Sequence, residues 1–195
     1  ALAAGPMLAQ ADVKLFGKVH MSVDYIDGQS DTQPATGKTT TVSSNTSRWG
    51  IDVKEKLGGQ LTAIAHLEQS LNADNETSSQ DVMNRYVGLS GSLGTILAGG
   101  YDTPFKQISR ATDFFGDQVG DTRALVAIGS GGANASRGWD LRPANTVRYD
   151  SPSMNGFKVA YLHSTDANAQ GAGTNSFDDN RNKANSLGLS YTGGP

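Results

Sequence analysis

The side chains of this sequence that are best suited to acid–base or metal chemistry are three histidines, His20, His66 and His163. None of them stands in the Ser-His-Asp or His-Glu-x-x-His arrangement of serine and zinc hydrolases. The glycine-rich run at residues 91–100 lacks the Gly-Lys-Ser/Thr ending of a phosphate-binding loop, and it therefore predicts a turn. The sequence thus predicts no enzyme, no metal site and no cofactor.

Charged side chains offer a different chemistry, because they form one acidic and one basic group. The acidic group is a row of aspartates spaced by four residues, unlike the carboxylates of an EF-hand calcium loop: Asp113, Asp117 and Asp121. The basic group consists of Lys18, Arg48, Arg85, Arg142 and Arg148. Opposed charges around a narrow aqueous passage would set up a transverse field that orients dipolar solutes. The alternative is that these side chains are ordinary solvated charges. The secondary structure that carries the charged residues determines which of the two interpretations holds.

Alternation of apolar and polar residues predicts about eight β-strands, because strand side chains point to opposite faces in turn. From Val13 to Tyr25 the odd positions are mostly apolar and the even positions mostly polar, with Phe16 as the exception. The predicted strands are residues 13–25, 48–57, 61–68, 85–90, 95–101, 146–150, 156–164 and 186–192. We place Lys18, Arg48 and Arg85 on the polar face, and we expect one or two helical turns between residues 105 and 126.

The composition restricts the class of protein. The absence of cysteine excludes disulfides and thiolate metal sites. A net charge of −3 argues against a nucleic-acid-binding surface, which needs a basic face. No run approaches the roughly 20 apolar residues of a transmembrane helix. With 24 glycines among 195 residues, the chain is typical of a β-protein with many turns.

Long and short connections alternate between the predicted strands. Short turns at "KLGGQ", "SGSLG" and "SPSMNG" separate long polar segments at residues 27–46, 72–84, 102–145 and 165–183. Outer-membrane barrels have this arrangement, with short periplasmic turns and long external loops. Their apolar face meets lipid, their polar face meets an aqueous lumen, and closure pairs every backbone group. The alternative is a secreted soluble β-sandwich, such as a binding or adhesin domain, whose apolar face would meet a second sheet.

The two ends and the longest connection indicate part of a larger barrel. Residues 1–11, "ALAAGPMLAQA", end in the small-x-small cleavage pattern of a secretory signal peptide, so we expect a signal remnant followed by a mature start at Asp12. Residues 12–195 would then be the N-terminal half of the barrel. The long third loop, residues 102–145, carries apolar side chains that a wide lumen could cover. We therefore expect the first eight strands of a barrel of about 16, rather than a closed barrel of eight.

Four segments of the chain resemble the general porins of Gram-negative bacteria, in particular those of Neisseria and related proteobacteria. They are "VKLFGKVHMSVDY", "SRWGIDVKEKLGGQLTAIAHLEQ", "NRYVGLSGSLGTILAGGYDTPF" and "NTVRYDSPSMNGFKVAYLH". They occur in the order and spacing of the family, and the resemblance covers residues 12–195. The chain departs from the family in having "KEKLGG" in place of the common "SEDLGG", and "FFGDQVGDT" in the third loop.

The resemblance implies a transmembrane antiparallel β-barrel of the outer membrane, usually a homotrimer, with the third loop folded inside as a constriction. It implies passive diffusion of ions and small hydrophilic solutes through a water-filled channel. The expected partners are outer-membrane lipid and lipopolysaccharide, two further copies of the chain, and the solutes themselves. The five basic residues would match the basic wall of the family, and Asp113 and Asp117 the acidic side of the waist, with Asp121 close by.

Overall fold

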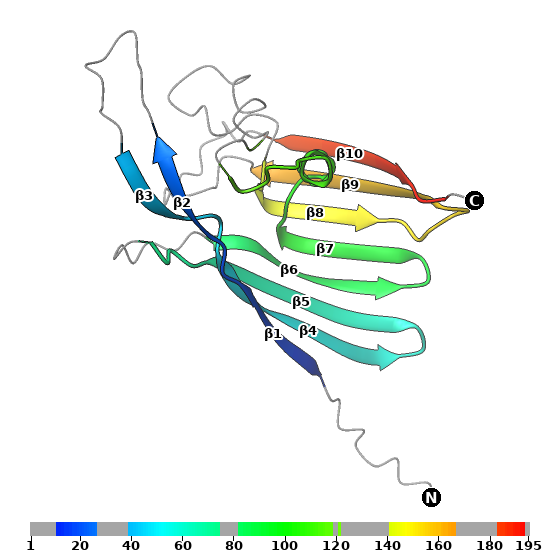
Figure 1. Ribbon diagram of the computed structural model, residues 1–195. Helices are drawn as coiled ribbons and strands as arrows, with labels where there is room; N and C mark the ends of the chain where they lie inside the picture. Colours follow the sequence, from blue (N-terminus) through cyan, green and yellow to red (C-terminus); the bar gives the residue numbers. More distant parts are fainter. Residues whose placement is uncertain are drawn as a thin grey trace, which may run out of the picture.

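The computed structural model of the chain describes residues 11–26, 39–74, 82–118, 121, 141–166 and 183–193. The main feature is one antiparallel eight-stranded sheet, in the order β1-β4-β5-β6-β7-β8-β9-β10 (Figure 1). Its strands are β1 (Asp12–Lys18), β4 (Arg48–Gly58), β5 (Leu61–Ser70), β6 (Val82–Gly91), β7 (Gly94–Gly100), β8 (Ala144–Asp150), β9 (Phe157–Asp166) and β10 (Ala184–Tyr191). From β4 onward, strands that follow one another in the chain are neighbours in the sheet, which is the up-and-down arrangement of a barrel wall.

Two further strands, β2 (Met21–Ile26) and β3 (Thr39–Ser44), form a separate two-stranded sheet that continues past β1 and β4 (Figure 1). The break falls where the Ser47 hydroxyl accepts a hydrogen bond from the His20 N–H (2.9 Å) and donates one to the His20 carbonyl (3.1 Å). The predicted strand at residues 13–25 is therefore confirmed but interrupted. The prediction that residues 39–44 belong to a loop was wrong, because their β-branched Thr and Val side chains suit a strand.

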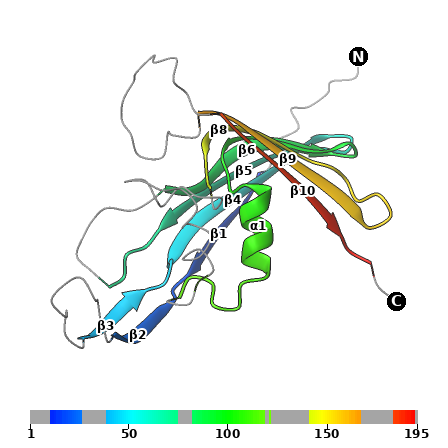
Figure 2. The same cartoon turned by 90° about the horizontal axis from the view of Figure 1, so that it is seen from above.

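The sheet is curved, and its convex face is apolar and exposed. Figure 2 shows the strands following an arc, with α1 (Pro104–Ala111) on the concave side. The exposed convex side chains include Val13, Leu15, Leu67, Val87, Leu89, Ile96, Val147, Leu187 and Leu189. Among the described residues no second sheet covers this face, so the soluble sandwich alternative is not supported. The predicted alternation of an apolar and a polar face is confirmed, with the apolar face on the convex side of the sheet and the polar face on the concave side, as in the wall of an outer-membrane barrel.

The helix α1 forms where the predicted helical turns were expected. Thr103 is its N-cap and accepts a hydrogen bond from the Lys106 N–H (3.2 Å), and Pro104 occupies the first turn, where the missing N–H costs nothing. The helix packs against β9 and β10, and Gly188 allows the approach, because a Cβ there would lie 2.8 Å from the Pro104 side chain. Among the described residues, no helix has the length and apolar character needed to cross a membrane.

Candidate pore constriction

Lys18 and Arg48 lie side by side on the concave face and share one carboxylate partner from the third loop. The two residues are direct register partners at the paired ends of β1 and β4. Asp117 Oδ2 lies 3.7 Å from Lys18 Nζ and 4.0 Å from Arg48 Nη1. Like charges directly opposite on neighbouring strands destabilise a sheet, so the aspartate offsets a repulsion that the wall would otherwise carry.

The loop therefore crosses the concave face from one side of the sheet to the other. Its helix α1 packs on β9 and β10, while Asp117, six residues past the end of the helix, pairs with β1 and β4. Arg110, in the last turn of α1, also approaches Asp117, with Nη2 to Oδ1 at 3.9 Å. The expectation that the third loop, residues 102–145, folds inward is confirmed for residues 102–118, which lie on the concave side of the sheet with α1 (Figure 2).

The wall itself carries a second carboxylate, Glu68 on β5. Its Oε1 lies 3.1 Å from Arg48 Nε, and its side chain is almost fully buried. Glu68 also lies 3.9 Å from His66 Nε2, while His66 Nδ1 and Asp52 Oδ1 are 2.6 Å apart. Arg48 is thus held between an acidic group of the wall and one of the loop, which fixes its guanidinium in the lumen.

Aromatic rings line the wall beside this cluster. They explain why Phe16, an apolar residue, occupies a position on the otherwise polar face. The Phe16 ring stacks on His66, which stacks on Tyr86, with ring centroids 5.4 and 5.0 Å apart. Tyr86 then meets Tyr101 edge to face. The Phe16 ring reaches His66 by lying over Gly50, where a Cβ would collide with it, so this glycine makes room for the stack.

The root of the third loop is fixed by the buried carboxylate of Asp102. Arg142 Nε contacts Oδ1 at 2.8 Å, Lys106 Nζ lies 3.7 Å from the same oxygen, and Arg110 Nη1 lies 3.6 Å from Oδ2. Asn84 adds hydrogen bonds with the Asp102 side chain and backbone N–H. Burial raises the pKa of Asp102, but the nearby cations, led by Arg142, outweigh it and hold that pKa below its usual value. Asp102 therefore stays ionised and anchors both ends of the loop.

Arg148 ties this root to the wall. Its guanidinium donates to Asp150, to the Gln107 side chain (2.9 Å) and to the Asp102 carbonyl (3.1 Å), and it lies 4.6 Å above the Tyr101 ring. With these partners Arg148 is almost fully buried. Its role is to position α1, rather than to face the open lumen.

The predicted site residues therefore separate into several groups. Lys18, Arg48 and Asp117 meet, and Arg142 and Arg148 fix the root of the loop. Asp121 is buried and accepts a hydrogen bond from the Asp117 N–H (2.7 Å), which holds the positive-φ backbone of that residue. Asp113 accepts a hydrogen bond from the Phe115 N–H (3.0 Å) and shapes the turn after α1.

The placement of Arg85 on the lumen face was wrong. Arg85 alternates with the exposed Val87 and Leu89 and pairs in register with Leu67 and Gly100, so it lies on the convex apolar face. The prediction placed Arg85 on the polar face together with Arg48. Because the period of a strand is two, a one-residue offset moves a side chain to the other face. Asn84, the preceding residue, is the one that faces inward.

Sequence reasoning did not single out the remaining members of the cluster. They are Glu68, Asn84, Asp102, Lys106 and Arg110. Alternation already placed Glu68 on the polar face with His66, which was the available signal for that residue. The signal for Asp102 was its position immediately after a strand. Within the described ranges, no group of three or more His, Cys, Asp or Glu side chains is arranged to hold a metal ion.

Comparison with known proteins agrees with this geometry. The sequence profile of the Gram-negative porin family matches residues 1–195. An outer membrane porin protein of Bordetella pertussis is 28% identical over 98% of this chain and 54% of its own length. The major outer membrane protein P.IB of Neisseria gonorrhoeae is 31% identical over 80% of this chain and 44% of its own length.

Solved structures show the same fold. The anion-selective porin from Comamonas acidovorans superposes with a TM-score of 0.64 at 26% identity, over 80% of this chain and 47% of that one. OmpF of Salmonella typhi superposes with a TM-score of 0.59 at 14% identity, over 91% of this chain and 48% of that one. The chain spans about half the length of the curated relatives it matches. Together with the curved, outwardly apolar sheet, these matches show that the chain belongs to the Gram-negative porin family of outer-membrane proteins.

Proposed function

We propose that the full-length protein forms a water-filled channel for passive diffusion of ions and small hydrophilic solutes across the outer membrane. The observation that carries this proposal is the third loop, which crosses the concave face and pairs through Asp117 with Lys18 and Arg48 of the wall. A loop placed there narrows the lumen, and a polar, charged waist admits hydrated solutes while excluding larger ones.

The constriction on this proposal consists of opposed charges within a few ångströms. Lys18 and Arg48 supply the basic side from the wall, and Asp117 supplies the acidic side from the loop. Arg142 and Arg148 contribute to the constriction indirectly, because they hold the root of the loop in position. Asp113 and Asp121 support the turn that presents Asp117.

By similarity to its relatives, we propose that the channel is a barrel of about 16 strands that assembles as a homotrimer in contact with outer-membrane lipid and lipopolysaccharide. One structural relative, OmpT of Vibrio cholerae, is described as a trimer form, and it shares the fold at 16% identity. Residues 1–11 are proposed to be a signal remnant, and they lie outside the described residues except for Ala11.

Reconstitution tests the proposal directly. The full-length protein, purified from outer membranes and added to a planar bilayer in KCl, should give stepwise conductance increases. Proteoliposomes should swell in small sugars and remain unswollen in large dextrans. A protein that assembles into the bilayer without conductance steps would contradict the proposed function.

A further inference from the structure

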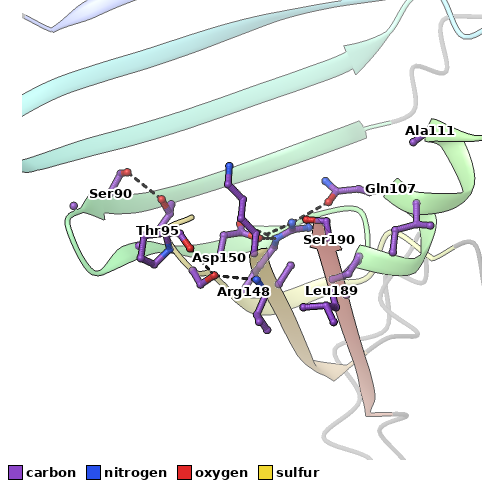
Figure 3. A pocket seen from close by; sticks show the side chains of 18 residues that line it. Ser90, Thr95, Gln107, Ala111, Arg148, Asp150, Leu189 and Ser190 are labelled. Carbon is purple, nitrogen blue, oxygen red and sulfur yellow. Dashed lines mark hydrogen bonds and ion pairs between the residues drawn. The ribbon is translucent and has the colours of Figure 1, made fainter. Parts of the chain in front are cut away.

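A cavity of about 560 Å³ lies between α1 and the concave surface of β6 to β10. Figure 3 shows Gln107 and Ala111 of the helix on one side and Ser90, Thr95, Asp150 and Ser190 of the wall on the other. Its volume falls in the range of small-molecule sites in proteins, roughly 300–1,000 Å³. The cavity is separate from the Lys18–Asp117 cluster, which lies on the same concave face but at the strands β1 and β4.

The charge inside the cavity is set by Lys158. Arg148 and Asp150 neutralise each other, since Arg148 Nε donates to both carboxylate oxygens (3.0 and 2.9 Å) and Nη2 donates to one of them (2.7 Å) (Figure 3). Lys158 is exposed on the cavity wall, and the described part of the chain supplies it with no ion-pair partner. One uncompensated ammonium group therefore remains, and it favours an anionic occupant.

Hydroxyl groups and apolar surface complete the lining. Ser190 is the direct register partner of Lys158, so its hydroxyl lies beside the base of the lysine. Ser90 and Thr95 share a hydrogen bond of 3.0 Å on the neighbouring part of the wall (Figure 3). Pro104, Ile108 and Ala111 present an apolar surface from the helix. Apolar lining with a few polar groups that fix orientation is the usual composition of a small-molecule site.

We propose that this cavity is a binding site for small organic carboxylates on their path through the lumen, with Lys158 holding the carboxylate. The hydroxyls of Ser90, Thr95 and Ser190 bind further oxygens, and the carbon skeleton packs against α1. The proposal rests on the proposed channel function. Occupancy of the cavity slows a carboxylate relative to chloride, and it lowers the ionic current while the carboxylate stays bound.

The test uses the full-length protein in a planar bilayer with succinate added to constant KCl. Succinate should reduce the conductance in a saturable way, and the uncharged succinamide should not. Lys158→Gln should raise the half-effect concentration of succinate about tenfold, as expected for the loss of a hydrogen bond to a charged group. Lys56→Gln is the matched control, because Lys56 is also exposed on the concave face but lies on β4, outside the cavity.

A second variant tests the cavity rather than the charge. Ala111→Trp fills part of the space without changing the net charge, and it should weaken the succinate effect as well. Equal effects of the two lysine variants, or no effect of Ala111→Trp, would overturn the proposal. Conductance in KCl alone reports the channel function separately, so a wild-type channel that conducts without any saturable succinate effect refutes the site and leaves the proposed function intact.

Discussion

The most direct test of the constriction is Asp117→Asn, which removes one carboxylate with little change of shape. Asp117 faces three cations at 3.7, 4.0 and 3.9 Å, on Lys18, Arg48 and Arg110. Because these side chains are partly exposed, each pair contributes about 0.2–1 kcal/mol, and the three pairs together stabilise the position of the loop by about 0.6–3 kcal/mol. The variant should therefore assemble and keep its channel.

The ion selectivity should change more clearly than the stability. For an ion passing about 6 Å from the carboxylate, Coulomb's law in water gives about 0.7 kcal/mol, which screening at physiological salt about halves. Asp117→Asn removes this interaction, which is worth about 0.35 kcal/mol after screening, so the substitution favours anions and disfavours cations by a factor of about 1.8 each. The anion-to-cation permeability ratio should therefore rise about threefold, measured as the reversal potential in a KCl gradient.

Asp74→Asn is the matched control for this experiment. Asp74 carries the same charge, but it lies after β5, where it accepts a hydrogen bond from the Ser44 N–H (2.9 Å). The control should leave the reversal potential near the wild-type value. If Asp117→Asn gives no shift, or a shift toward cations, then Asp117 does not face the permeating ions and the assignment of the waist is wrong.

Three further outcomes test the faces of the sheet and the root of the loop. Arg85→Gln should leave the reversal potential unchanged, because Arg85 lies on the convex face. A shift of the reversal potential toward cation selectivity would show that Arg85 faces the lumen after all. Val87→Lys places a charge on the lipid face and should cost about 2–4 kcal/mol, seen as loss of the heat-modifiable folded band on a gel, whereas Ser90→Lys on the concave face should assemble. Asp102→Asn should lower the unfolding free energy by about 2 kcal/mol at pH 7. The pKa of Asp102 is lower in the folded than in the unfolded protein, so the stability that its carboxylate contributes is complete above the unfolded pKa of about 4 and is lost as the pH falls through the folded pKa. The thermal unfolding of the wild type and the variant should therefore converge only in acid.

Alternation along the strands was sufficient to predict the faces of most residues. Lys18 and Arg48 lie on the concave face because the residue that follows each of them, Val19 or Trp49, is an exposed apolar residue of the opposite parity. The same rule, applied from Val87 and Leu89, places Arg85 on the convex face, so the prediction that Arg85 faces the lumen departed from the rule. In a strand, the face on which a side chain lies depends only on whether it is an even or an odd number of residues from a neighbour of known face. A similar place relative to the start of a strand does not determine the face.

Pairing across the lumen could not be predicted in this way. Arg142 contacts Asp102, 40 residues earlier in the chain, and Asp117 contacts Lys18, because the loop turns back across the sheet. Periodicity determines which face of the sheet a side chain lies on, but it gives no information about the path of an irregular loop. The expected separation into a basic wall and an acidic loop is for this reason only partly correct, since the wall supplies Glu68 and the loop supplies Arg110.

This mixing of charges determines how the waist can select ions. The cationic side chains are Lys18, Arg48 and Arg110, and the carboxylates in contact with them or directly behind them are Glu68, Asp117 and Asp121. Among the described residues of this group, the three cations and three carboxylates balance, so we expect them to produce a local field with only a small net potential along the pore. In a balanced cluster, the loss of any one charge determines the sign of the residual potential. Neutralising Arg48 and neutralising Asp117 should therefore shift the reversal potential by similar amounts in opposite directions, and shifts in the same direction would show that the two side chains do not act on one shared aqueous path.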